Sequence, residues 1–396
     1  MKINFLLVEL GHTGGCLAIY KHADNLTELG HEVAITTPAG AIAWKKGAYG
    51  RILAGHHKKT VFEDKHFGAP LRGLRAGVRK LKACARWFRP APDNCLLEVE
   101  GLTTALLRNS PPADVVVATY WKTALAAAYL SAKSTALFYM QHYEELLLPK
   151  GDMRRRMNCR MSYGLPVHLI SNSDWLRDQI KKRYSRDSYR IEHAVTRPDL
   201  FHAAGLDLSE KFSRPQPIRI VSYCNAWPLK GWKHAAEAMR LVQEKHPEIL
   251  WQTFGQSVPV PGVKVQHLGR ITDEELADLY RRSHIGFMSS IFESFPLPPL
   301  EMMACGCAVV TTPLGTEAYT RDGQNCLLAR PADARDLADK ILSLVEDLST
   351  ARRLAKAGVD TSKDFTWKKS TSRLLEIIEL AKKADNFADI ERMPYE

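Results

Sequence analysis

The sequence predicts an α/β protein whose domains are each built on a parallel β-sheet. The chain has 396 residues, enough for two or three domains with sizeable hydrophobic cores. Hydrophobic residues make up 45% and charged residues 25%, which excludes a disordered, collagen-like or coiled-coil chain. Short apolar runs alternate with amphipathic stretches, and this alternation is typical of a sheet covered by helices on both faces.

The first half contains five expected strands and two clear helices. The helices cover residues 12–30, opening at a Gly-Gly pair, and 175–184. Apolar runs of four to six residues are typical of buried strands. The expected strands cover residues 3–8, 32–36, 115–118, 135–140 and 167–171.

The pattern starts again after residues 201–217, which contain two prolines and no strong periodicity. We therefore expect an N-terminal domain over 1–205, a C-terminal domain over 206–370 and a helical tail over 371–396 that packs back towards the N-terminal domain. Ligands of such sheets bind beyond the carboxyl ends of the strands, so a binding cleft is expected between the domains. The second-half elements are strands at 218–223, 249–254, 263–268, 285–289 and 308–312, and helices at 232–245 and 300–305.

The positive charge is confined to one half of the chain. The net charge is +11, with 30 basic and 18 acidic residues in 1–200 against 25 and 26 in 201–396. Residues 71–89 combine leucines at helical spacing with seven Arg or Lys, between Pro70 and Pro90. This pattern indicates an anionic membrane surface or an anionic acceptor, although a helix with a solvated basic face gives the same pattern. No nucleic-acid-binding motif accompanies the charge, so nucleic acid is not an expected partner.

Two carboxylates, Glu293 and Glu301, stand eight residues apart at an expected strand-loop-helix junction. Such a junction presents backbone N–H groups and the positive end of a helix dipole, which suit a diphosphate. A carboxylate there can accept hydrogen bonds from a ribose diol. By spacing alone, a solvated loop residue and a helix-favouring glutamate explain the pair better than a binding site does.

The context of this pair resembles the E-x7-E signature of family 4 glycosyltransferases, which have the GT-B fold of two Rossmann-like, doubly wound domains facing across a cleft. The resemblance covers nearly the whole chain. In the second half, the segments that carry it are Glu293 to Glu301 with the Met-Met-Ala-Cys-Gly-Cys that follows, and also 267–271, Lys230-Gly231, 322–328 and 365–367. In the first half they are Gly14-Gly15, 30–33 and 171–173. Residues 120–124 and 141–144 are similar to bacterial rhamnosyltransferases of polysaccharide assembly.

The resemblance implies roles for particular residues. Glu293 would contact the transferred sugar, Glu301 the ribose and Lys230 the diphosphate leaving group. His142 lies where the family often has a His or Asp near the sugar, and a structural histidine is an equally good interpretation. The remaining donor-binding candidates are Gly14, Gly15, Asn225, Arg270, Ser294, Phe295 and Leu297.

Three departures from the family pattern concern the donor. Asn225 replaces an expected arginine, so one phosphate charge is missing or is supplied by another residue. Pro296 replaces a glycine and has no N–H, so one backbone donor is lost while those of Phe295 and Leu297 remain. Residues 193–196 replace the family's N-G-V-D.

The expected function is a retaining glycosyltransferase that uses a nucleoside-diphosphate sugar as co-substrate and needs no cofactor. The acceptor is a hydroxyl of a lipid-linked or cell-surface glycan. No D-x-D pair is present, so no metal site is expected. The alternative is a catalytically impaired nucleotide-sugar-binding or scaffold protein on the same fold. The eight scattered cysteines and the absence of a signal-peptide pattern indicate a cytoplasmic protein, peripheral on the inner face of the membrane.

Overall fold

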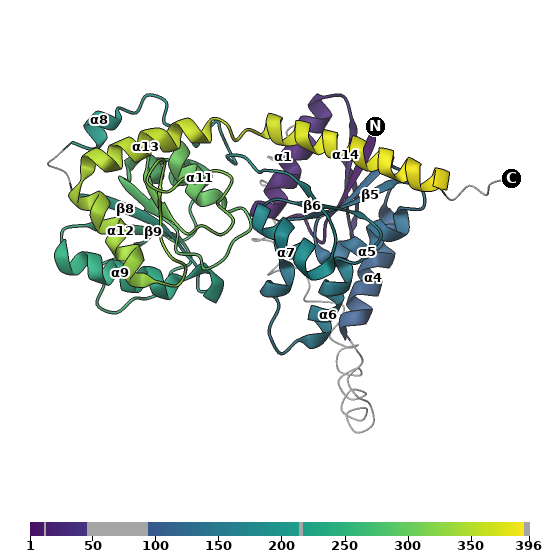
Figure 1. The fold of residues 1–396 in the computed structure, drawn as a ribbon, viewed down its shortest axis with the longest axis horizontal. Coiled ribbons are helices and arrows are strands. Elements are labelled where there is room, and N and C mark those ends of the chain that lie inside the picture. The colour runs from purple at the N-terminus through teal and green to yellow at the C-terminus, as the bar shows by residue number, and fades with distance from the viewer. Residues whose placement is uncertain (12, 46–93, 214–216, 392–396) are drawn as a thin grey trace, which may run out of the picture. The chain divides into compact units, whose positions relative to one another are not determined.

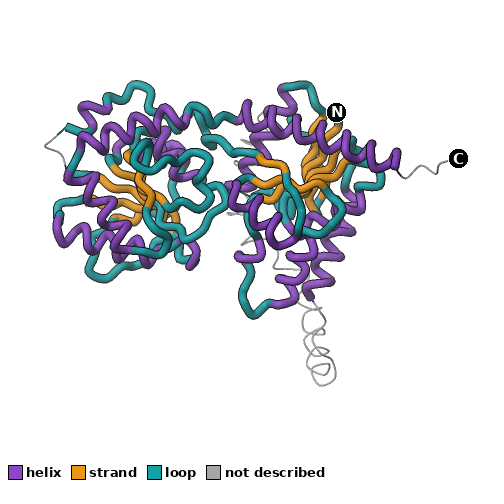
Figure 2. The backbone as a smooth tube through the Cα atoms, in the orientation of Figure 1, coloured by secondary structure: helices purple, strands orange, loops and turns teal. Residues whose placement is uncertain are grey.

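The computed structural model describes residues 1–11, 13–45, 94–213 and 217–391 and divides the chain into two compact units. The first unit comprises Met1–Tyr139, Glu144–His168 and Leu380–Glu396. The second comprises Met140–Tyr143 and Leu169–Glu379. In each unit helices surround a central sheet (Figures 1 and 2). The domain limits predicted from the sequence stay predictions, as does the basic segment 71–89, which lies outside the described residues.

The first sheet has the strand order β3-β2-β1-β4-β5-β6-β7. Its pairs are parallel where β1 meets β2 and β4, because helices carry the chain back between these strands, while β3 returns antiparallel from β2. Strand β4 is apolar and buried throughout, and β1 is buried after Lys2, with the polar Asn4 among its buried residues. The strands are β1 (Lys2–Leu6), β2 (Glu32–Thr37), β3 (Gly40–Ala43), β4 (Val115–Ala118), β5 (Thr135–Met140), β6 (His168–Ser171) and β7 (Tyr189–Arg190).

The helices of this half begin with side-chain caps where the sequence offers them. Thr13 caps α1 by accepting from the amide of Cys16, and Ser173 caps α7 by accepting from Leu176. The helices are α1 (Gly14–Glu28), α4 (Asn94–Asn109), α5 (Trp121–Leu130), η2 (Glu144–Leu147), α6 (Met153–Ser162), α7 (Asp174–Tyr184) and α8 (Leu208–Lys211).

The second sheet has the order β10-β9-β8-β11-β12-β13 with parallel pairing. The apolar cluster on one face contains residues of α9 and α12, and the cluster on the other contains residues of α10 and α11, so both faces are buried. The strands are β8 (Arg219–Cys224), β9 (Leu250–Gly255), β10 (Gln266–His267), β11 (Ile285–Phe287), β12 (Ala308–Thr311) and β13 (Leu327–Leu328). The helices are η3 (Pro228–Lys230), α9 (Trp232–Lys245), α10 (Asp273–Arg282), α11 (Leu297–Ala304), α12 (Ala334–Glu346), α13 (Leu348–Ser362) and α14 (Trp367–Glu391).

Two features differ from the sequence expectation. Helix α11 begins at Leu297, three residues before the expected start, because prolines are well tolerated in the first turn of a helix. The long strand expected over 263–268 is reduced to Gln266–His267. Among the described residues, no helix combines the length and the apolar character needed to cross a bilayer.

Candidate functional site

The strand order of the second sheet defines one place where loops leave neighbouring strands in opposite directions. From β8 the chain builds outward through β9 and β10, then returns to β11 on the other side of β8. Such a switch point is where open α/β sheets bind ligands, beyond the carboxyl ends of the strands. Lys230 follows β8 and Glu293 follows β11, so the sequence candidates flank this point.

The loop after β8 is rigid because its polar groups are paired locally. Asn225 accepts from the amide of Trp227 at 2.8 Å and donates to the Tyr223 hydroxyl at 2.9 Å. Gly231 has a φ of +67°, and a Cβ there would lie 2.0 Å from the carbonyl oxygen of Ser289. Only glycine allows this approach, which fixes the loop bearing Lys230 against the loop bearing Glu293. The Asn225 side chain therefore holds the loop together, while its predicted place among the donor-binding residues stays a prediction.

Lys230 and Glu293 form an ion pair, with Nζ 2.6 Å from Oε1 and side-chain exposures of 20% and 8%. Ser290 also donates to Glu293 Oε1 at 2.8 Å. The lysine ammonium lies about 6 Å from the ring centres of Tyr223 and Trp227. The sequence predicted these two residues at one site, and the structure brings their side chains into contact.

His142 joins this pair within the second unit. Its ring meets Phe292 edge-on at 4.8 Å and lies 6.4 Å from Trp227. Burial lowers the pKa of His142 to about 4, while Glu293 opposes and Lys230 assists the shift, so the ring is neutral near pH 7. Both ring nitrogens are buried, and the backbone of Tyr143 contributes a hydrogen bond to the ring that raises the pKa slightly. The contact of His142 with the transferred sugar stays a prediction.

Asn172 connects the His142 segment to the Glu293 segment, a relationship that sequence reasoning missed. Its Nδ2 donates to the carbonyl of Gln141 at 3.1 Å, and its Oδ1 accepts from the Ser294 hydroxyl. Asn172 and Ser294 are each 1% exposed. Buried polar groups with complete pairing hold one geometry strongly, so Asn172 sets the spacing of residues 142 and 293. The only sequence signal was the match of 171–173 to the family pattern.

Glu301 lies inside α11, whereas the sequence had suggested that it lies at the start of the helix. The carboxyl is buried and accepts a hydrogen bond from Thr196, a residue known from the sequence only as a departure from the family pattern. Burial raises the pKa of Glu301 to about 7, with a smaller contribution from Asp273, while the Thr196 bond lowers it. Glu301 is thus half ionised near neutral pH and has spare acceptor capacity.

The N-terminus of α11 is a poorer anion site than the sequence suggested. The cap is Pro296, and the first turn contains Pro298 and Pro299. A helix leaves the N–H groups of its N-cap and its first three residues unpaired. Three of these four positions are proline here, so only Leu297 has an N–H group. The side chain of Phe295 is buried against His193 and Tyr319, so only its backbone can face a ligand.

Arg270, Gly14 and Gly15 are the remaining predicted donor-binding residues, and each is described within its own unit. Arg270 is exposed and follows Gly269 at the end of β10. Gly14 and Gly15 open α1 in the first unit, where their lack of side chains leaves the backbone of this turn accessible. The described residues contain no group of three or more His, Cys, Asp or Glu arranged to hold a metal ion.

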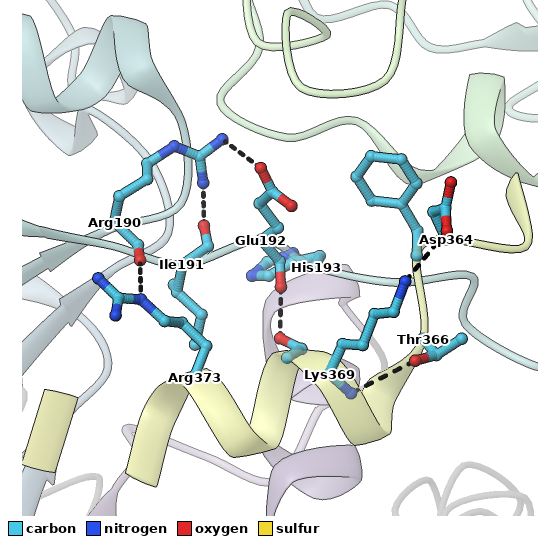
Figure 3. A pocket seen from close by; sticks show the side chains of 10 residues that line it. Arg190, Ile191, Glu192, His193, Asp364, Thr366, Lys369 and Arg373 are labelled. Carbon is cyan, nitrogen blue, oxygen red and sulfur yellow. Dashed lines mark hydrogen bonds and ion pairs between the residues drawn. The ribbon is translucent and has the colours of Figure 1, made fainter. Parts of the chain in front are cut away.

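A pocket of about 400 Å³ in the second unit is separate from these residues (Figure 3). It lies where residues 190–193 run along the start of α14, joined by bonds from Arg373 to the carbonyl of Arg190 and from Ser370 to that of Glu192. Its charged groups are paired, as in Lys369 with Asp364 at 3.0 Å. The pocket therefore joins two chain segments and offers no unpaired charge to a ligand.

Comparison with known proteins finds glycosyltransferases that are similar to this chain. Residues 217–347 match the family described as glycosyl transferases group 1. The chain is 32% identical over 313 residues to a D-inositol 3-phosphate glycosyltransferase of Arthrobacter sp. (strain FB24), covering 71% of this chain and 73% of that protein. It is 26% identical over 352 residues to the O-antigen biosynthesis protein RfbC of Myxococcus xanthus, covering 84% of this chain but only 26% of RfbC.

Solved structures agree in fold. HepE of Anabaena, in complex with UDP-glucose, superposes with a TM-score of 0.66 at 18% identity, covering 96% of this chain and 99% of that one. Sucrose-phosphate synthase of Thermosynechococcus elongatus gives 0.67 at 16% identity, covering 97% and 100%. With the two strand orders above, these likenesses establish the predicted GT-B fold of two Rossmann-like domains.

Proposed function

Because the chain belongs to the group 1 glycosyltransferases, we propose that it transfers a hexose or deoxyhexose from a nucleoside-diphosphate sugar to a hydroxyl of a lipid-linked or cell-surface glycan. The E-x7-E signature of Glu293 and Glu301 supports an assignment to family 4, with retention at the anomeric carbon and no metal requirement. The names of the relatives support the acceptor class, since they include O-antigen biosynthesis protein RfbC and O-antigen chain mannosyltransferase B. The HepE complex with UDP-glucose supports the donor class.

The observation that carries the proposal is the grouping of Lys230, Glu293 and His142 at the switch point of the second sheet. In the proposed reaction the bond between the anomeric carbon and the diphosphate oxygen breaks, and the diphosphate leaves with the electron pair. The acceptor hydroxyl oxygen bonds to the anomeric carbon on the same face, and its proton passes to the departing diphosphate. Lys230 neutralises the charge that develops on the leaving group. Glu293 and the neutral imidazole of His142 hydrogen-bond the hydroxyls of the transferred sugar and orient it.

Glu301 completes the proposed donor site as the acceptor for the ribose hydroxyls. Its carboxyl is held by Thr196 through one oxygen only, which leaves acceptor positions for a diol. A nucleoside binding there favours the ionised carboxylate and lowers the pKa of Glu301 from about 7.

A catalytically impaired nucleotide-sugar-binding protein is the second candidate, favoured by two observations. Asn225 is used within its own loop, and the first turn of α11 has lost most of its amides to proline. Both reduce the groups available to a diphosphate.

A panel of nucleoside-diphosphate sugars, screened by thermal stabilisation, tests the proposal. A bound donor raises the unfolding temperature with the logarithm of its concentration over its Kd. Hydrolysis or transfer from the stabilising donor distinguishes the enzyme from the binding protein. If no donor stabilises the chain at millimolar concentration, both candidates fail.

A further inference from the structure

The first turn of α11 keeps a single backbone N–H group, that of Leu297, and a buried hydroxyl sets its direction. Tyr319 is 1% exposed, and its hydroxyl donates to the carbonyl of Pro296 at 2.7 Å. That carbonyl and the Leu297 N–H belong to one peptide unit, which is planar and trans, so the two groups point in opposite directions. The Tyr319 hydroxyl therefore turns the Leu297 N–H away from the apolar cluster in which the tyrosine is buried.

The Tyr319 side chain is held firmly, so its hydroxyl has one position. The ring packs on Phe295 with ring centres 5.4 Å apart and meets Phe365 edge-on at 5.9 Å. The backbone carbonyl of Tyr319 accepts from the side-chain amide of Asn325 at 2.8 Å. Burial raises the pKa of Tyr319 well above its ordinary value, so the hydroxyl keeps its proton near neutral pH and continues to donate.

The turn that carries Tyr319 is also fixed against the loop that carries Glu293. Gly315 has a φ of +85°, and a Cβ there would lie 2.5 Å from the carbonyl oxygen of Glu293, so only glycine allows this approach. Thr312, at the start of the same turn, donates to the carbonyl of Ser290 at 2.7 Å. Contacts at both ends and in the middle therefore hold the loop on the turn.

The peptide between Ser290 and Ile291 shows what lies on the other side of this loop. Its carbonyl faces the turn, and its N–H donates at 2.8 Å to the carbonyl of Leu229, the residue before Lys230. The peptide at the far end of the loop has the same arrangement, with its carbonyl on the turn and the N–H of Leu297 directed away from it. The side away from the turn is the side of the lysine.

We infer that Tyr319 is a positioning residue of the proposed donor site and aims the Leu297 N–H at the diphosphate. This inference rests on the proposed function, because it assigns the amide to the same leaving group that Lys230 neutralises. Prolines remove every other N–H group from this turn. No neighbouring amide can replace a misdirected one, so the orientation of this single group matters for stabilising the leaving group.

Calorimetric titration with inorganic pyrophosphate, which carries the diphosphate without base or sugar, tests the inference. Tyr319→Phe keeps the ring and removes the bond to Pro296, and we expect pyrophosphate to bind about three- to tenfold more weakly. Ser283→Ala is the matched control, because it removes another buried hydroxyl that donates to a backbone carbonyl at 2.7 Å, that of Leu279 in α10. The control should lower the unfolding temperature to a similar extent and bind pyrophosphate like the wild type.

Leu297→Pro separates positioning from a general structural role, because it deletes the N–H group itself. Proline is tolerated at the first position of a helix, and Pro296 before it already has an extended ψ of 126°. If Tyr319 acts through this amide, Tyr319→Phe weakens pyrophosphate binding in the wild-type chain and has no further effect in the Leu297→Pro chain. An equal loss in both backgrounds would overturn the inference.

A second measurement serves if Leu297→Pro unfolds early. In spectra of the chain labelled with 15N-leucine, pyrophosphate should shift the Leu297 amide of the wild type and shift it less in Tyr319→Phe. An amide that pyrophosphate leaves unshifted in the wild type would overturn the inference, as would a wild-type chain that does not bind pyrophosphate.

The two proposals fail separately. If sugar donors stabilise the chain while Tyr319→Phe binds pyrophosphate like the wild type, the inference falls and the transferase proposal stands. If pyrophosphate binding depends on Tyr319 as expected but no sugar donor stabilises the chain, the positioning role stands and the transferase proposal falls.

Discussion

Lys230 Nζ lies 2.6 Å from Glu293 Oε1, although the residues are 63 positions apart and follow different strands. The side chains are partly screened from water, so the pair holds both of them extended into one place. A diphosphate that binds Lys230 exchanges one anionic partner for another. Glu293 is then released to accept from sugar hydroxyls, which couples donor binding to the orientation of the sugar in the proposed site.

Replacing Lys230 with alanine should weaken binding of the free nucleoside diphosphate by about 10- to 100-fold, because a charge-assisted contact is lost. Isothermal titration with the diphosphate of the stabilising donor measures the effect. Lys233→Ala removes an exposed charge three residues away and serves as the matched control. If both variants lose the same affinity for the diphosphate, the effect is a general loss of positive charge and not the loss of a specific contact with Lys230.

Glu293→Gln should separate binding from turnover. The diphosphate should bind as tightly as before or more tightly, because Lys230 no longer has a competing carboxylate. The turnover number should fall by about 100-fold or more, since the lost contact is with the reacting sugar. Steady-state kinetics and titration on the same preparation give both quantities. A parallel loss of diphosphate affinity would place Glu293 at the phosphates instead.

Asn172 should act as a positioning residue. Asn172→Ala leaves the buried Gln141 carbonyl and Ser294 hydroxyl without their partner and should lower the free energy of unfolding by about 1–3 kcal/mol. Asn172→Asp can still accept from Ser294 but cannot donate to Gln141. If Asn172 holds His142 in place, both variants should lower turnover with little change in KM. A loss of stability with unchanged turnover would leave Asn172 a purely structural role.

The raised pKa of Glu301 predicts how the free energy of unfolding depends on pH. Its pKa rises from an ordinary 4.5 to about 7 on folding, so the folded chain binds more protons than the unfolded chain between these values. Its stabilising contribution is complete below about pH 4.5 and is lost as pH rises through 7, on the order of 3 kcal/mol at most. Glu301→Gln should flatten this dependence in urea titrations from pH 4.5 to 8. Parallel curves for the variant and the wild type would contradict the raised pKa.

If the proposed transfer needs no metal, it should continue in excess EDTA. The proposed leaving-group stabiliser is Lys230, which chelation does not affect. Measurement of turnover before and after dialysis against EDTA, followed by addition of magnesium or manganese, decides the matter. If EDTA abolishes turnover and added metal restores it, Lys230 alone does not stabilise the leaving group.

The elements that the sequence predicted best are those with strong local patterns. Strands 115–118 and 135–140 and helix 232–245 begin and end where expected, because uninterrupted apolar runs and a clear helical period set their limits. Helix α11 was misplaced because its first turn is proline-rich, which reads locally as a loop. β7 and β13 are too short for a local signal and exist only because neighbouring strands pair with them.

The sequence by itself determined the GT-B fold class, the pairing of two carboxylates with a lysine as site candidates, and the confinement of charge to the first half. The fold class and the site candidates follow from the resemblance of these motifs to a family pattern, and the charge distribution follows from composition. Only the tertiary structure decided that Lys230 contacts Glu293, that Asn172 links residues 141 and 294, and that Thr196 bonds Glu301. The reason is that each contact joins side chains from different strand ends, at distances set by sheet order and burial. No pattern within a single segment encodes such a distance.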